Sequence, residues 1–391
     1  MQKQTKAIHF DYQRPDAYGA LSMPVYHCAA YEFENAADMV ESFCGRSDMP
    51  DYSRVTNPTV TYFERKIQAL TKAQDVVAFS SGMAAISNTL FCLAASGRTI
   101  LTSRHLFGNT LALINGTMRR FGVEVVFCDL TDLNAVEAAI SEKTCCIFME
   151  IMTNPQLEVV DIPALSSLAH KHRLPLIADT TMVPFTVFDG KALGIDVEVV
   201  SSTKYISGGA TSIGGIVIEH SVNPEFKQRM RQEMLMNFGA YMTPHVAYMQ
   251  TLGLETLAVR YEKQTQNALL LAEALEKMPG VKAVRYPGLP NDAFHHVATR
   301  QFGARPGAMI SMELADKESC FAFLDRLNLI RRATNLFDNR SLAIHPASTI
   351  FGNFTEEQRR SIDISDRIIR LSVGLEAVED LIEDVRQALE A

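Results

Sequence analysis

The chain has 391 residues, of which 47% are hydrophobic and 21% charged, and its formal net charge is −8. This composition excludes a disordered chain, and mild acidity without a basic cluster argues against a nucleic-acid partner. No apolar run reaches the roughly 18 residues that a membrane-spanning helix requires. The start of the chain lacks a hydrophobic signal segment, so we expect a cytoplasmic protein without a membrane partner. The 7 cysteines form no CxxC pair and the histidines have no ligand spacing, so we expect no metal site.

Residues 1–58 show little hydrophobic periodicity and are punctuated by turn residues. A segment without a core of its own is expected to pack on the rest of the chain or on another subunit. Within it, Tyr52 and Arg54 are two residues apart, and in an extended segment both side chains would point to the same side. A loop anchored by an exposed arginine is the simpler interpretation of these two residues alone.

From residue 59 onward, strands and helices alternate. A helix over 61–73 and a strand over 76–79 are followed by a small-residue turn at Ser81-Gly82 and a helix that begins at Met83. This arrangement presents backbone N–H groups and a helix N-terminus to an anion, although an ordinary strand-to-helix turn has the same pattern. Further strands and helices are predicted at 99–101, 110–120, 123–127, 133–140, 145–149, 163–172 and 176–178. The alternation predicts a mainly parallel sheet covered on both faces.

Functional sites of such sheets form at the carboxyl ends of the strands, where Asn154, Asp179 and Lys204 are expected. Asp179 follows an apolar strand, so its buried carboxylate needs a cationic or hydrogen-bonding partner; it either caps a turn or contacts a ligand. Lys204 lies in a short turn between two apolar strands, after Ser201 and Thr203. It is either a surface lysine of a hairpin or a Schiff-base lysine whose neighbours hold a cofactor phosphate.

After Lys204, helices are predicted at 223–238 and 254–278, and the second is long enough to connect two domains. A shorter α/β pattern follows, with strands at 281–286, 308–314, 329–333 and 368–373 and helices at 317–327 and from 377. Arg370 interrupts the last apolar strand, where an arginine is costly unless it meets an anion. Two domains are also what a chain of this length favours.

Five motifs occur in order along the chain. They are Tyr52-Ser53-Arg54, Ser81-Gly82-Met83-Ala84-Ala85, Asp179-Thr180-Thr181, Ser201-Ser202-Thr203-Lys204-Tyr205 and Arg370-Leu371-Ser372-Val373-Gly374. Together they resemble the transsulfuration family, the pyridoxal-phosphate enzymes of cysteine and methionine metabolism. The resemblance implies an α/β fold of the aspartate-aminotransferase type (fold type I), pyridoxal 5'-phosphate as the cofactor, and a homodimer that commonly pairs into a tetramer. It also implies an N-terminal segment (1–58) that packs on a neighbouring subunit, a cofactor-binding domain (59–252) and a smaller C-terminal α/β domain (253–391).

The resemblance gives each motif a role. Lys204 would bind the cofactor covalently and move protons, and Asp179 would pair with the pyridine nitrogen. Asn154 would face the phenolic oxygen of the cofactor. The phosphate would be held by one subunit and by two residues of its neighbour, namely Gly82, Met83, Ser201 and Thr203 from the first and Tyr52 and Arg54 from the second.

The same resemblance assigns the substrate side of the site. Arg370 would bind the α-carboxylate of an amino-acid substrate, with Asn335 beside it. Phe107 stands where the family usually has a tyrosine that stacks on the cofactor and assists proton transfer, so its ring keeps the stacking surface and loses the hydroxyl. Tyr52 from the neighbouring subunit is a further candidate proton donor.

Within the family, the stretches 150–155 and 335–342 resemble O-acetylhomoserine sulfhydrylases in particular. The leading prediction is therefore γ-replacement on an O-acylhomoserine by sulfide or a small thiol. A carbon–sulfur lyase that cleaves methionine or cystathionine is the alternative within the family. A homologue that binds pyridoxal phosphate without catalysis is a third, disfavoured because Lys204, Asp179 and Arg370 are all present.

Overall fold

The computed structural model describes residues 1–391 apart from 11, 13–15, 17, 222–223 and 391. Within the described residues, the larger sheet has seven strands in the order β1-β7-β6-β5-β4-β2-β3. These strands are β1 (Asp75–Phe79), β2 (Thr99–Thr102), β3 (Glu124–Phe127), β4 (Thr144–Glu150), β5 (Leu176–Asp179), β6 (Val197–Val200) and β7 (Gly215–Glu219). All pairings from β3 to β6 are parallel, whereas β7 pairs antiparallel with β6 and β1. The predicted mainly parallel sheet is confirmed.

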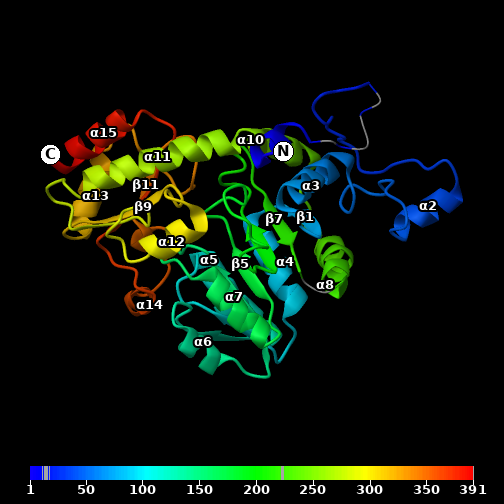
Figure 1. Ribbon diagram of the computed structural model, residues 1–391, viewed down its shortest axis with the longest axis horizontal. Coiled ribbons are helices and arrows are strands. Elements are labelled where there is room, and N and C mark those ends of the chain that lie inside the picture. Colours follow the sequence, from blue (N-terminus) through cyan, green and yellow to red (C-terminus); the bar gives the residue numbers. More distant parts are fainter. Residues whose placement is uncertain (11, 13–15, 17, 222–223, 391) are drawn as a thin grey trace.

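Helices cover both faces of this sheet (Figure 1). Val76 of β1 packs in one apolar cluster with Phe63 of α3 (Pro58–Thr71). The next residue, Val77, packs in a second cluster with Leu90 of α4 (Gly82–Leu93). Because successive strand residues point to opposite faces, α3 and α4 lie on opposite sides of the sheet. The other helices before the second sheet are α5 (Gly108–Ala112), α6 (Leu133–Ala139), α7 (Ile162–Lys171), α8 (Pro224–Arg229), α9 (Met236–Phe238), α10 (Pro244–Glu255) and α11 (Leu257–Leu275).

Three of the predicted helices differ in the structure. The helix expected over 110–120 begins at Gly108 and widens into a π-helical turn at Leu113–Thr117, then tightens into a 3₁₀ turn at Met118–Phe121. The helix expected over 223–238 also contains a π-helical stretch, Met230–Leu235, and its first predicted residue lies outside the described residues. A repeat of about 3.6 residues in the apolar pattern does not distinguish these widened turns from a regular helix.

The helix expected over 254–278 is two helices, α10 and α11, that meet at Thr256. The Thr256 hydroxyl donates to the Gly253 carbonyl (3.3 Å) and accepts from Arg260 Nε (3.1 Å). A threonine side chain that bonds to nearby backbone competes with the helical hydrogen bonds. This competition explains a break that the apolar periodicity does not reveal.

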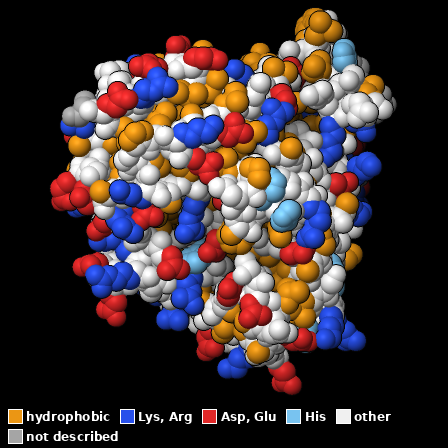
Figure 2. All heavy atoms as spheres, turned by 60° about the vertical axis from the view of Figure 1, so that its left-hand side comes forward, with side chains coloured by type: hydrophobic (Ala, Val, Ile, Leu, Met, Phe, Trp, Pro, Cys, Tyr) orange, Lys and Arg blue, Asp and Glu red, His pale blue; other side chains and the backbone are white. Residues whose placement is uncertain are grey.

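The second sheet contains five strands within the described residues, in the order β10-β11-β12-β9-β8. They are β8 (Ala283–Arg285), β9 (Met309–Glu313), β10 (Arg331–Arg332), β11 (Leu342–Ile344) and β12 (Ile368–Ser372), accompanied by α12 (His295–Phe302), α13 (Lys317–Arg326), α14 (Glu356–Ser361) and α15 (Val378–Glu390). Strand β11 was not predicted. Figure 2 shows positive and negative side chains interspersed over one face of the molecule. The division of the chain at 58–59 and 252–253 stays a prediction.

The N-terminal segment forms an arm that ends in α2 (Ala36–Phe43) and projects from the rest of the molecule (Figure 1). Its first helix, α1 (Lys3–Ile8), is fixed to the larger unit, the part of the chain that carries the larger sheet. Lys3 Nζ donates to the Phe185 and Phe188 carbonyl oxygens at 2.8 and 2.6 Å. Met39, Val40 and Phe43 of α2 are exposed. Among the described residues, none of the helices combines the length and hydropathy that a membrane crossing requires.

Candidate active site

Three strands of the larger sheet end side by side and place the candidate residues at one edge. Glu150 is the register partner of Asp179, and Asp179 is the partner of Val199 on β6. Because β4, β5 and β6 are parallel, the segments that follow them leave the sheet at the same edge. Asn154 follows β4 and Lys204 follows β6, so the structure brings both residues to the end of β5, where Asp179 lies.

Lys204 is partly buried, and its Nζ donates to Asn335 Oδ1 at 2.9 Å. The pKa of Lys204 is lowered to about 8, chiefly by burial and also by the positive charge of Arg370, while the charge of Asp179 acts in the opposite direction. With such a pKa, a larger fraction of the amine is deprotonated near neutral pH than for an ordinary lysine, which favours a Schiff-base nucleophile. This lowered pKa favours a reactive lysine in the turn after β6 over an ordinary hairpin lysine, and the role of Lys204 stays a prediction.

Asp179, at the end of β5, is the predicted partner of the cofactor's ring nitrogen. Its Oδ1 accepts the Thr181 backbone N–H at 2.9 Å. Burial raises the pKa of Asp179, while the hydrogen bonds from Thr181 and the positive charge of Lys204 lower it. A carboxylate in this setting is favoured in its charged form by a cation placed beside it.

Arg370 lies in β12 of the second sheet and is only 2% exposed. Its Nη1 donates to Asn154 Oδ1 at 3.3 Å, and its Nη2 donates to the Thr334 and Asn335 carbonyl oxygens at 3.2 and 3.4 Å. Among the described residues, its Nε has no hydrogen-bond partner. Burial lowers the pKa of Arg370 to about 9. A buried guanidinium without an anionic partner fits a site for a substrate carboxylate.

The N-terminus of α4 packs directly against the lysine turn. Ser81 caps this helix by accepting the Ala84 N–H at 3.1 Å. A Cβ on Gly82 would lie only 2.7 Å from Ser201 Cβ, so glycine is required for this close approach. Thr203 Oγ1 accepts the Gly214 N–H at 3.1 Å. Helix N–H groups and hydroxyls gathered in this way form a donor set that suits a phosphate.

Met83 is the second residue of α4 and is partly buried, so it lies at the same helix N-terminus. Its sulfur accepts a hydrogen bond from Thr110 Oγ1 at 3.9 Å, which links α4 to α5. Phe107 immediately precedes α5. The loop that carries Phe107 is thereby tied to the predicted phosphate-binding residues.

Glu150 is a site residue that the sequence analysis missed. Its buried Oε1 accepts the Phe107 backbone N–H at 2.5 Å. Burial raises the pKa of Glu150 well above its ordinary value, and the charge of Asp179 adds to this effect, while backbone hydrogen bonds from Phe107 and Asn154 oppose it. The signal in the sequence was an acidic residue at the end of an apolar strand, four residues before Asn154.

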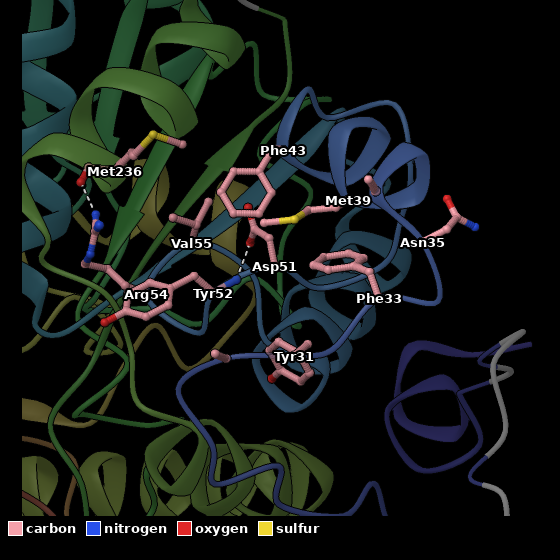
Figure 3. A pocket seen from close by; sticks show the side chains of 12 residues that line it. Tyr31, Phe33, Asn35, Met39, Phe43, Asp51, Tyr52, Arg54, Val55 and Met236 are labelled. Atoms are coloured by element: carbon pink, nitrogen blue, oxygen red, sulfur yellow. Dashed lines mark hydrogen bonds between the residues drawn. The ribbon is translucent and has the colours of Figure 1, made fainter.

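Tyr52 and Arg54 are not brought to Lys204 within this chain. They line a separate cavity of about 930 Å³ between the arm and the larger unit (Figure 3). Arg54 Nη1 donates to the Met236 carbonyl oxygen, and the guanidinium carbon lies 5.5 Å from the centre of the Tyr52 ring. Residues 53–55 form a turn, so the segment is not extended and the loop interpretation of these residues holds. A role of these two residues in a neighbouring subunit stays a prediction.

A lysine in a turn after a parallel strand and a carboxylate at the end of the adjacent strand define, with the two-sheet architecture, a pyridoxal-phosphate enzyme of fold type I. Residues 4–390 match the model of the Cys/Met metabolism PLP-dependent enzyme family. The chain belongs to this family, as its five motifs indicated, and its cofactor is pyridoxal 5'-phosphate.

Two curated relatives illustrate the reactions found in the family. Over 390 residues the chain is 37% identical to an L-methionine gamma-lyase of Pseudomonas deceptionensis, and the alignment covers 99% of this chain and 97% of that protein. Over 382 residues it is 36% identical to an O-succinylhomoserine sulfhydrylase of Pseudomonas aeruginosa, with coverages of 97% and 93%.

Solved structures agree with this assignment. A protein of Campylobacter jejuni assigned as an O-acetylhomoserine (thiol)-lyase superposes with a TM-score of 0.96 at 33% identity, over 100% of both chains. That structure contains a pyridoxyl-lysine phosphate group. A cystathionine gamma-lyase of Lactobacillus plantarum, in complex with L-serine, superposes with a TM-score of 0.91 at 32% identity, over 100% of this chain and 99% of that one.

Proposed function

We propose that this enzyme catalyses γ-replacement on an O-acylhomoserine, with O-acetylhomoserine as the preferred ester and sulfide or a small thiol as the nucleophile. The observation that carries the proposal is Phe107, which provides an aromatic ring but no acidic hydroxyl in the loop bonded to Glu150. The relatives include both sulfhydrylases and methionine lyases, so the distinction rests on what this site does with the group that leaves the γ-carbon.

The residues present fit the cofactor. The phosphate would be held by the N-terminus of α4 and the hydroxyls of the lysine turn, from Gly82, Met83, Ser201 and Thr203, and by Tyr52 and Arg54 of a neighbouring subunit. Asp179 would pair with the ring nitrogen, Asn154 would face the phenolic oxygen, and Lys204 would form the covalent link. When bound, pyridoxal phosphate supplies an electron sink for the carbanion that follows removal of a substrate proton.

The chain's own residues bind the substrate and move its protons. Arg370 is buried and its Nε has no partner in the part of the chain that the structure describes, so Arg370 binds the α-carboxylate and fixes the amino acid relative to Lys204. Lys204 Nζ, with its lowered pKa, accepts a proton and returns it near neutral pH. Asn335 Oδ1 accepts a hydrogen bond from Nζ, which limits the positions that the amine occupies.

The choice of leaving group follows from acidity. A carboxylate leaves as a weak base, with carboxyl pKa values near ~4 as a guide. A thiolate, with a pKa of about 8.5, depends far more on a proton donor as its bond to carbon breaks. Phe107 donates no proton, and Lys204 and the neighbour's Tyr52 are the remaining donors. The site therefore favours an ester over a thioether.

Two further parts of the proposal concern assembly and location. The exposed apolar side chains of α2 and the position of Tyr52 and Arg54 away from Lys204 favour a homodimer as the active unit, with two dimers paired as a tetramer. The charge and composition of the chain favour a cytoplasmic enzyme.

The test is a comparison of kcat/KM for O-acetylhomoserine and O-succinylhomoserine, each with sulfide, against methionine and cystathionine. We expect O-acetylhomoserine to give the highest value. Faster cleavage of methionine would support the lyase alternative and overturn the proposal. Binding of the cofactor without turnover of any of the four substrates would favour the non-catalytic alternative.

A further inference from the structure

Phe337 adopts a backbone conformation that its side chain disfavours. Its φ is 54°, in the left-handed region, where a Cβ crowds the backbone and a bulky residue is an outlier. The residue lies in the loop between β10 and β11 and is fully buried. Strained backbone of this kind persists only where the surrounding contacts require it, and it is concentrated at functional sites.

The contact that holds Phe337 is an aromatic stack on Tyr205. The two ring centroids are 3.9 Å apart and the rings are inclined by only 4°. Ring centroids of aromatic pairs usually lie about 4.5–7 Å apart, so the two rings are unusually close and the packing around the pair holds them in contact. Tyr205 is the residue that follows Lys204. The stack therefore joins a loop of the second sheet to the turn that carries the lysine.

The same loop holds the polar groups around Lys204. The Phe337 N–H donates to Ser372 Oγ at 2.6 Å, and Ser372 lies two residues beyond Arg370 on β12. Two residues before Phe337, Asn335 accepts from Lys204 Nζ at 2.9 Å, and its carbonyl oxygen accepts from Arg370 Nη2 at 3.4 Å. One short loop thus contacts the reactive lysine and the buried arginine.

Asp338 sets the orientation of the Asn335 amide. Asn335 Nδ2 donates to Asp338 Oδ2 at 3.3 Å, which leaves Oδ1 directed at Lys204. Asp338 is buried, and it is fixed by the Arg340 N–H on its Oδ1 at 3.1 Å and by Gln264 Nε2 on its carbonyl oxygen at 2.8 Å. Asn335 is thus bonded at its carbonyl oxygen by Arg370 and at its side-chain amide to Asp338, and Phe337 lies in the chain between Asn335 and Asp338.

We propose that the Phe337–Tyr205 stack is a positioning contact that keeps Asn335 on the Lys204 nitrogen and so adjusts the proton affinity of that nitrogen. Phe337 acts through Tyr205 and Asn335 and contacts no reacting atom. The proposal rests on the proposed role of Lys204 as the cofactor lysine, and it holds for either the sulfhydrylase or the lyase reaction.

The test is a pH titration of the visible absorbance of the holoenzyme, because the midpoint reports the proton on the nitrogen of Lys204 that carries the cofactor. A hydrogen-bond acceptor on that nitrogen favours the protonated form, so Asn335→Ala is expected to lower the midpoint by about one pH unit. Phe337→Leu and Tyr205→Leu keep apolar volume but remove the stack, and each should lower the midpoint in the same direction. The double variant Phe337→Leu/Tyr205→Leu should shift the midpoint no further than the single variant with the larger effect.

Two control variants separate positioning from stability. Tyr205→Phe keeps the stack and should leave the midpoint unchanged. Phe323→Leu removes a ring from α13, where Phe323 is also buried, and should lower the thermal midpoint without moving the titration. If Phe337→Leu does not fold, the Tyr205 variants carry the test alone.

The outcomes are distinguishable. A titration midpoint at the wild-type value in Phe337→Leu or Tyr205→Leu, alongside a lowered one in Asn335→Ala, would overturn the proposal. An unchanged midpoint in Asn335→Ala would overturn it as well. Failure of the proposed role of Lys204 is recognised separately, because borohydride reduction and peptide mapping would then find the cofactor on another lysine.

Discussion

Glu150 and Asp179 are register partners on adjacent parallel strands, so two carboxyl groups lie side by side at the edge of the larger sheet. Burial raises the pKa of both, and the charge of Asp179 raises that of Glu150 further. Only Asp179 has Lys204 as a compensating cation. Two interacting carboxyls share their protons unequally. Of the two carboxyls, Glu150 has the more strongly raised pKa, and Asp179 is the one whose charge Lys204 compensates.

The first prediction concerns the stability of Glu150→Gln. The ordinary pKa of a glutamate is 4.5, and the folded-state pKa of Glu150 lies well above it. Between those two pH values the folded protein binds more protons than the unfolded one, so the contribution of Glu150 lowers the free energy of unfolding as the pH rises. Glutamine keeps an oxygen for the Phe107 N–H and does not ionise. As the pH rises from about 4.5 to about 7.5, the free energy of unfolding of the variant should therefore increase by at least about 1 kcal/mol relative to that of wild type.

Urea unfolding of both proteins at the two pH values, at one protein concentration, measures this difference. Glu150→Ala serves as the matched comparison, because it leaves the Phe107 N–H without a partner and should be destabilised at both pH values. An equal stability difference between Glu150→Gln and wild type at the two pH values would contradict the raised pKa of Glu150.

The second prediction concerns the phosphate-binding turn. In Gly82→Ala the new Cβ would lie 2.7 Å from Ser201 Cβ and 3.0 Å from its Cα, so α4 or the lysine turn must shift. Overpacking of this size corresponds to about tenfold weaker cofactor binding, measured by titration of the apoenzyme with pyridoxal phosphate. Gly116→Ala is the control, because its Cβ would have nothing within 4 Å. Equal affinities of the two variants would argue against a phosphate site at Gly82.

The third prediction concerns the covalent link. Borohydride reduction of the holoenzyme should fix the cofactor to the peptide that contains Lys204, and Lys204→Ala should give no reduced adduct. Lys191→Ala, which removes an exposed lysine, should behave as wild type. An adduct of wild-type yield in Lys204→Ala would assign the link to another residue.

Much of this architecture could be predicted from the sequence. Alternating strands and helices imply a parallel sheet with its site at the carboxyl ends of the strands, which placed Asp179 and Lys204 correctly. Contacts between distant segments carry no local pattern. The Phe107–Glu150 hydrogen bond spans 43 residues, and Phe337, whose backbone is left-handed, stacks on Tyr205, far away in the sequence. The turn at 53–55 was missed because a short polar stretch has no periodicity to interpret.

The fourth prediction concerns the active unit. If Tyr52 and Arg54 complete a neighbour's site, then Arg54→Ala and Lys204→Ala are each inactive, but a hybrid dimer contains one intact site. Random mixing of the two variants should restore about a quarter of wild-type activity. Each variant mixed with itself is the control. If mass-tagged subunits exchange and activity still does not return, each site is built from one chain.

The last prediction concerns Phe107→Tyr. A tyrosine restores a proton donor in the loop bonded to Glu150, and a positioned donor contributes most where the leaving group is a strong base. Cleavage of methionine releases a thiolate, whereas replacement on O-acetylhomoserine releases acetate. The ratio of kcat/KM for methionine to that for O-acetylhomoserine should therefore rise at least about tenfold in the variant. Phe107→Leu is the matched control, since it removes the ring without adding a hydroxyl and should leave the ratio near that of wild type. If the ratio is unchanged in Phe107→Tyr, position 107 does not decide between the two reactions.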